Sequence, residues 1–240
     1  RAGTAAVQAE HAVAGGGEHA PHLVVAAFDQ RKPRMPGIDG LETTRRMRDA
    51  DIDALMAQIH GPLNFEMAAT DEMQAIALKH RPHAVCIVPE KREERTTEGG
   101  LDVAGDVARL TAFIAPLREV GSRVSLFIGH DPVQIRASAE AGAAVVELHT
   151  GHYCDLHYEG RFEERDAELA ALKEGAALAA SLGLEVHAGH GLTFETVAPI
   201  AAIPQVVELN IGHFLIAESV FIGLEAALSK MRDLMDAARD

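Results

Sequence analysis

Residues 184–212 read LEVHAGHGLTFETVAPIAAIPQVVELNIG and contain two short apolar runs, 184–189 and 206–212, that each end at a glycine. A segment with a helical pattern separates the two runs. Strand, helix and strand in this order predict a βαβ unit, in which the two strands lie parallel in one sheet.

The same unit recurs towards the N-terminus. Apolar runs at 64–69, 84–89, 123–128 and 144–150 are each followed by a helical pattern. Thr70 is a candidate N-cap for the first of these helices. Near the C-terminus an apolar stripe predicts one more helix, with Val220, Leu224, Leu228, Met231 and Met235 on one face.

Six such strands need two more to close an eight-stranded barrel. The candidates are GTAAVQA (3–9) and HLVVAAFDQ (22–30), the second of which has the composition of either a strand or a helix. No linker rich in proline or serine separates this region from the rest. We therefore predict a single-domain α/β protein over residues 1–240, a TIM (β/α)8 barrel, with a doubly wound open sheet as the alternative.

Composition limits the partners of the chain. A net charge of −14 over 240 residues argues against nucleic acid or an anionic membrane, which need a positive protein surface. Cys86 and Cys154 are the only cysteines, so no disulfide framework is expected. No apolar run approaches the roughly 18 residues that cross a bilayer. These features predict a cytoplasmic protein with small-molecule partners.

Polar residues gather where the predicted strands end, which is where a parallel barrel carries its active site. They are Glu66, Glu147, His149, His187, His190, Asn210 and His213. One carboxylate in a strand can be a structural ion-pair partner, and one histidine can be an ordinary polar residue. Their occurrence at several strand ends favours acid–base chemistry, because buried carboxylates and imidazoles can be tuned towards neutral pKa values.

Two strand exits carry glycines directly before a predicted helix. Gly189, Gly191 and Gly212 let the backbone approach a ligand closely, and a helix N-terminus favours phosphate. Helix–strand packing also uses glycine, so the pattern alone leaves both interpretations open. The charged segment 90–103 ends in TTEGG, which suits either a solvated loop or a loop that covers a bound anion.

A metal-dependent hydrolase is a competing hypothesis. The string HTGHYCDLH supplies His149, His152, Cys154 and His157, to which the exits at 187 and 190 add two more imidazoles. These spacings match no closed zinc pattern, so we expect no bound metal.

Several long strings in the same order resemble one enzyme family. They are NFEMAAT, VPEKREERTTEGGLDV, RVSLFI, VVELHTG, LEVHAGHGLT and IAAIPQVVELNIGHFLIAESVFIGL. Together they are similar to pyridoxine 5'-phosphate synthases of vitamin B6 biosynthesis, from about Met47 to the C-terminus.

The resemblance implies a TIM barrel, usually octameric, that condenses 1-deoxy-D-xylulose 5-phosphate with 3-amino-2-oxopropyl phosphate. The products would be pyridoxine 5'-phosphate, inorganic phosphate and water, and no redox cofactor takes part. Catalytic roles would fall on Glu66 as acid–base, His190 as proton donor and Glu147 as stabiliser of a charged transition state. The substrate-binding residues would be Thr96 for deoxyxylulose phosphate, and Gly191, Gly212 and His213 for the amino-ketone phosphate.

Residues 1–46 depart from that family. Where its first strand carries a VNIDH string this chain has AGTAAVQA, and ungapped counting puts Asp39 and Leu41 at the positions of a catalytic histidine and a substrate-binding arginine. The string RMPGIDGLETTRRMR (34–48) instead resembles a response-regulator receiver, but Lys32 stands where the phosphoacceptor aspartate belongs. A barrel that binds phosphate without catalysis is therefore a further alternative.

Overall fold

The computed structural model describes residues 6–10, 22–26, 52–53, 56–58, 61–89 and 99–239. Eight strands in this part of the chain form a closed barrel in the order β1-β2-β8-β7-β6-β5-β4-β3. The strands are β1 Ala6–Glu10, β2 His22–Ala26, β3 Leu63–Met67, β4 Ala84–Ile87, β5 Arg123–Ile128, β6 Val145–His149, β7 Glu185–Gly189 and β8 Val206–Asn210. The predicted TIM-barrel class and all six predicted downstream strands are thus confirmed.

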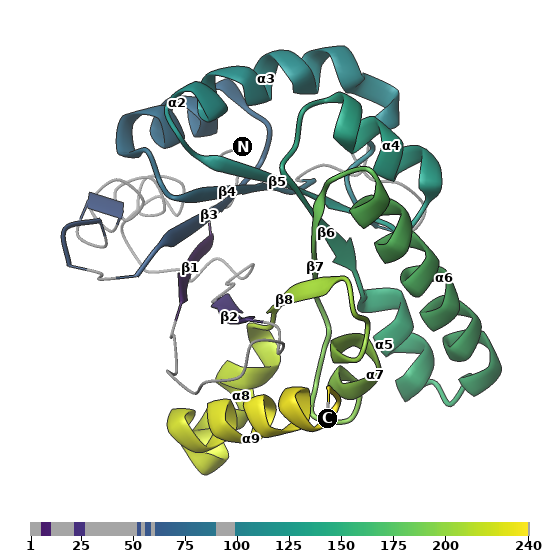
Figure 1. Cartoon of the computed structure of the whole chain (residues 1–240). Coiled ribbons are helices and arrows are strands. Elements are labelled where there is room, and N and C mark those ends of the chain that lie inside the picture. Colours follow the sequence, from purple (N-terminus) through teal and green to yellow (C-terminus); the bar gives the residue numbers. More distant parts are fainter. Residues whose placement is uncertain are drawn as a thin grey trace, which may run out of the picture.

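Helices surround the sheet, as Figure 1 shows for α3, α4 and α6 on one side and α8 and α9 on another. They are α2 Asp71–His80, α3 Val107–Glu119, α4 Pro132–Glu140, α5 Gly151–Tyr158, α6 Phe162–Ser181, α7 Val197–Ala201, α8 His213–Ile222 and α9 Leu224–Ala237, with a short 3₁₀ turn, η2, at Ala104–Asp106. Among the described helices none is both long and apolar enough to cross a membrane.

The N-terminal strands depart from an all-parallel barrel. Strand β2 pairs in parallel with β8, but β1 lies antiparallel to both β2 and β3. Residues 11–21 join β1 to β2. A parallel pair needs a crossover of a dozen or more residues, usually helical, whereas an antiparallel pair closes over a shorter connection.

The apolar core lies between the sheet and the helices. In β3, Leu63, Phe65 and Met67 are buried, while Asn64 and Glu66 between them are half-buried and face the other side. Because successive side chains of a strand point to opposite faces, the apolar set packs against the helices and the polar set faces the barrel interior. This alternation decides which polar groups can meet inside the barrel.

The predicted C-terminal helix is two helices. Gly223, with φ 84°, separates α8 from α9, a conformation that glycine adopts without strain. Met231 and Met235 are buried as predicted, but Val220 is 79% exposed and lies on the other helix. The five residues of the predicted stripe therefore do not form one buried face.

Thr70 caps α2 as predicted, because its side chain accepts a hydrogen bond from the Met73 N–H at 3.3 Å. We expect Thr70→Ala to lower the free energy of unfolding by about 1 kcal/mol, since one amide of the first turn loses its partner. Thr70→Ser keeps the hydroxyl and should stay close to wild type. Urea unfolding followed by circular dichroism compares the two, and equal stability would contradict the capping role.

Candidate active site

Glu66 and Glu147 both face the barrel interior. Glu66 on β3 is in register with Cys86 on β4, and the Cys86 thiol donates to Glu147 Oε2 on β6 at 3.5 Å. Burial raises the pKa of the Cys86 thiol well above its ordinary value, and the charges of Glu147 and Glu66 raise it further. The two predicted catalytic carboxyl groups therefore both lie near the Cys86 thiol.

Glu147 is fully enclosed. Its side chain lies so close to β7 that a Cβ on Gly189 would stand 2.5 Å from Oε1. Burial raises the pKa of Glu147 to about 7, while His187 opposes this rise and Glu208 adds to it. A carboxyl group with this pKa exchanges a proton near neutral pH, which is what acid–base catalysis requires.

Two histidines lie together at the C-terminal ends of β6 and β7, the end of the barrel that we call its mouth. The His149 and His190 rings stack with centroids 4.9 Å apart, and the Phe127 ring meets His149 edge-on at 5.0 Å. Gly151 leaves room for this stack, because a Cβ there would lie 2.6 Å from His149 Cε1. His190 directly follows the last residue of β7 and is exposed at the barrel mouth.

The backbone at the His190 exit is unusual. His190 has φ 78° and Gly191 φ 84°. A left-handed conformation at a residue other than glycine costs about 1–3 kcal/mol and is concentrated at functional sites. Thr150 holds the turn, since its Oγ1 lies 2.7 Å from the carbonyl oxygens of both Gly189 and His190.

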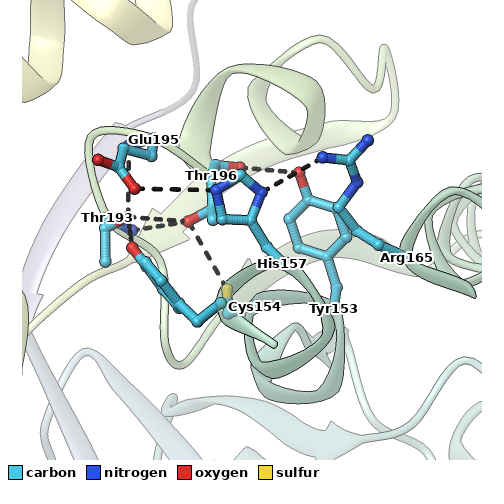
Figure 2. A network of polar contacts seen from close by, with 8 residues as sticks. Tyr153, Cys154, His157, Arg165, Thr193, Glu195 and Thr196 are labelled. Carbon is cyan, nitrogen blue, oxygen red and sulfur yellow. Dashed lines mark hydrogen bonds and ion pairs between the residues drawn. The ribbon is translucent and has the colours of Figure 1, made fainter. Parts of the chain in front are cut away.

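The loop that follows this turn is fastened to α5 by the polar network in Figure 2. The Thr196 hydroxyl accepts from the Thr193 N–H at 2.9 Å, and the Cys154 thiol lies 3.7 Å from the same hydroxyl. The hydroxyl groups of Tyr158 and Thr193 form a hydrogen bond of 2.5 Å. These contacts fix the loop that carries Gly191.

The histidine-rich string does not converge on one point. His149 faces the barrel mouth, Cys154 is buried against Thr196, and His157 lies 3.8 Å from Glu195 beside Arg165. Among the described residues no cluster of three or more His, Cys, Asp or Glu side chains has an arrangement that could hold a metal ion.

The predicted phosphate-binding residues sit at the start of a helix. Gly212 is the N-cap of α8 and His213 its first residue, and no side chain caps this end. The first amides of a helix that lacks a side-chain cap are suited to an anion. Gly191 packs on α5, where its Cβ would stand 3.2 Å from Cys154 Cβ.

Thr96 lies outside the described residues, as do Asp39 and Leu41. The segment that follows Thr96 does reach the mouth. A Cβ on Gly99 would lie 3.6 Å from His149 Nε2, and the Leu101 N–H donates to the Phe127 carbonyl at 2.8 Å.

Sequence reasoning missed the charged residues in the lower half of the barrel. Glu185 and Glu208 hold His187 between them, at 2.7 Å from Nε2 and 2.9 Å from Nδ1 respectively, and Arg123 binds Glu185 at 2.9 Å. Burial alone would lower the pKa of His187, but the two carboxylates outweigh it and raise this pKa to about 9. In LEVHAG and VVELN the charged residues alternate with apolar ones, and this pattern could have predicted that their side chains face the barrel interior.

Comparisons with known proteins indicate one family. A family described as pyridoxal phosphate biosynthesis protein PdxJ matches residues 17–237, which extends well upstream of Met47. Pyridoxine 5'-phosphate synthase of Cereibacter sphaeroides is 68% identical over 209 residues, covering 85% of this chain and 83% of that protein. The enzyme of the same description from Ruegeria pomeroyi is 61% identical over 229 residues, covering 93% and 91%.

A solved structure of low sequence identity shares the fold alone. The Bacillus subtilis YkuI protein, with an EAL domain, has a TM-score of 0.54 and 12% identity, over 95% of this chain and 61% of that one. Family membership is decided by the sequence relatives and by the match that spans most of the barrel. The chain belongs to the PdxJ family of pyridoxal phosphate biosynthesis proteins.

Proposed function

We propose that this chain is an enzyme that forms pyridoxine 5'-phosphate from 1-deoxy-D-xylulose 5-phosphate and 3-amino-2-oxopropyl phosphate. The observation that carries the proposal is the placement of two interior carboxyl groups, Glu66 and Glu147, below a strained histidine, His190, at the barrel mouth. The name that relatives 68% and 61% identical carry supports the same activity.

The reaction joins two phosphorylated ketones, so it must remove protons from carbon or nitrogen and protonate departing oxygens in one enclosed site. Glu66 serves as acid–base and His190 as proton donor, while Glu147 stabilises charge that develops between them. Gly191, together with the first amides of α8, holds the phosphate of the amino ketone.

Thr96 binds deoxyxylulose phosphate, and Gly99, three residues further along the chain, lies beside His149. Carboxyl and imidazole groups carry all of these steps, so the reaction needs no redox cofactor. Both cysteines are free and buried, which suits the reducing cytoplasm where we place this enzyme.

The enzyme works as a homo-oligomer, an octamer by resemblance to its family. Support comes from an exposed apolar surface at the junction of α8 and α9, the α8–α9 patch, formed by Ile216, Val220, Phe221, Ile222 and Leu224. Val220 is 79% exposed and Phe221 83%. Contiguous exposed apolar side chains of this kind mark contact surfaces.

Glu66→Gln and His190→Asn test the catalytic assignment. Each should lower turnover by about 10²–10⁴-fold, since a general acid or base contributes that much. Glutamine keeps the shape of Glu66, and asparagine tolerates the left-handed backbone at 190 better than most residues do. Steady-state kinetics with unchanged circular dichroism is the measurement, and full activity in both variants would show that the chemistry belongs to other residues.

Val220→Glu tests the oligomer contact. A charge in the α8–α9 patch should break the assembly into smaller species, because it would be buried without a partner. Val133→Glu is the matched control, since Val133 is 60% exposed on α4, outside the patch. Sedimentation velocity gives the masses, and a Val220→Glu protein with the wild-type mass would remove the patch from the interface.

A further inference from the structure

Five ionisable side chains meet inside the barrel below the mouth, and we name them the interior charge cluster. They are Arg123 on β5, Glu147 on β6, Glu185 and His187 on β7, and Glu208 on β8. The Arg123 and Glu185 side chains are 36% and 39% exposed, whereas His187 and Glu208 are only 3% and 9% exposed. The Arg123–Glu185 ion pair is therefore partly exposed to solvent, whereas His187 and Glu208, next to Glu147, are buried.

The position of His187 between two carboxylates favours its doubly protonated, positively charged form. Its Nε2 lies 2.7 Å from Glu185 Oε1 and its Nδ1 lies 2.9 Å from Glu208 Oε1. An ionised carboxylate only accepts hydrogen bonds, so Nε2, which is hydrogen-bonded to Glu185, carries a hydrogen. The Nδ1 contact with Glu208 is at ion-pair distance, and a positive ring is attracted to both carboxylates. A neutral imidazole would turn one lone pair towards a carboxylate. The pKa of about 9 for His187 supports the same charge.

The charges in the cluster balance without Glu147. Arg123 and His187 carry two positive charges, and Glu185 and Glu208 carry two negative charges, so their sum is zero. An ionised Glu147 would then be one uncompensated charge in a buried space, which is costly.

Glu147 also has neighbours on the opposite side of the barrel. Cys86 on β4 donates a hydrogen bond to Glu147, and Glu66 on β3 is in register with Cys86. The charge of His187 and the polar contacts from Cys86 and Asn210 oppose protonation of Glu147. Burial and the charge of Glu208 favour it, and burial is the largest of these effects.

We propose that the interior charge cluster keeps Glu147 protonated in the resting enzyme, and that His187 and Glu208 are positioning residues that set the level of this protonation. The inference rests on the proposed function and sharpens the role of Glu147 from charge stabiliser to general acid. The carboxyl O–H bond breaks as its proton moves to a departing oxygen. That oxygen keeps the electron pair of its broken C–O bond and leaves as water. With a pKa of about 7, Glu147 holds its proton below neutral pH and loses it as the pH rises above neutral.

Two substitutions change the balance in opposite directions. In Glu208→Gln a negative charge is lost, an ionised Glu147 would restore neutrality, and its pKa should fall. In His187→Gln a positive charge is lost, the negative excess grows, and the pKa of Glu147 should rise. We expect shifts of at least about one pH unit each, which corresponds to about 1.4 kcal/mol.

Infrared difference spectroscopy of the enzyme without substrate measures the titration directly. The band of a protonated buried carboxyl group is assigned to Glu147 by its loss in Glu147→Gln. Glu119→Gln is the matched control, because Glu119 is exposed at the end of α3 and solvent screens its charge. This control should leave the midpoint unchanged.

The dependence of activity on pH measures the same pKa independently. Activity that needs protonated Glu147 is lost as pH rises through its pKa, so the alkaline limb should move to lower pH in Glu208→Gln and to higher pH in His187→Gln. A purely structural role would lower activity without opposite shifts.

Shifts in the same direction, or an unmoved midpoint in a folded Glu208→Gln protein, would overturn the inference. Glu208→Gln decides the matter alone if His187→Gln does not fold. Because the infrared titration involves no substrate, it also separates this inference from a failure of the proposed reaction.

Discussion

The contact between His187 and its two carboxylates is the constraint on which the interior of this barrel depends. Small barrels usually fill their centre with branched apolar side chains, whereas the described part of this one holds the interior charge cluster as well as Glu66. Buried ion pairs rarely add stability over well-packed apolar residues, but removal of one partner is strongly destabilising. We therefore attribute the interior charge cluster to catalysis and not to stability. The charges of its other four members cancel, so Glu147 alone decides whether the cluster is neutral or negative.

The barrel mouth depends on a second set of contacts that holds a strained turn. His190 keeps a left-handed backbone because Thr150 binds the two carbonyls before and at the turn, and because His149 stacks on its ring. The network around Thr196 then ties the following loop to α5. An imidazole held in this way stands above the interior carboxyl groups, at the end of the barrel where substrates of this fold class bind.

Much of this arrangement could be predicted from sequence, because strands of a parallel barrel have a strong local pattern. Glu66, Glu147 and His190 stood out as polar residues at the ends of apolar runs, and the structure places them inside the barrel or at its mouth. The contact of His187 with Glu208 was missed because it depends on the register between β7 and β8, which one strand alone does not contain. Its contact with Glu185, two residues earlier on the same strand, could have been predicted from alternation. The break at Gly223 was missed because apolar periodicity continues across it. The antiparallel direction of β1 could not be predicted, because the sequence of a five-residue strand does not indicate which way it runs in the sheet.

Catalysis itself is the point to test, because Asp39 and Leu41, the expected counterparts of a catalytic histidine and a substrate-binding arginine, lie outside the described residues. The most direct measurement is product formation by the purified 240-residue chain supplied with 1-deoxy-D-xylulose 5-phosphate and 3-amino-2-oxopropyl phosphate, followed by mass spectrometry and by phosphate release. The account predicts pyridoxine 5'-phosphate and inorganic phosphate in equal amounts, and only when both substrates are present. Binding of the two phosphates without any pyridoxine 5'-phosphate above the enzyme-free rate would contradict it.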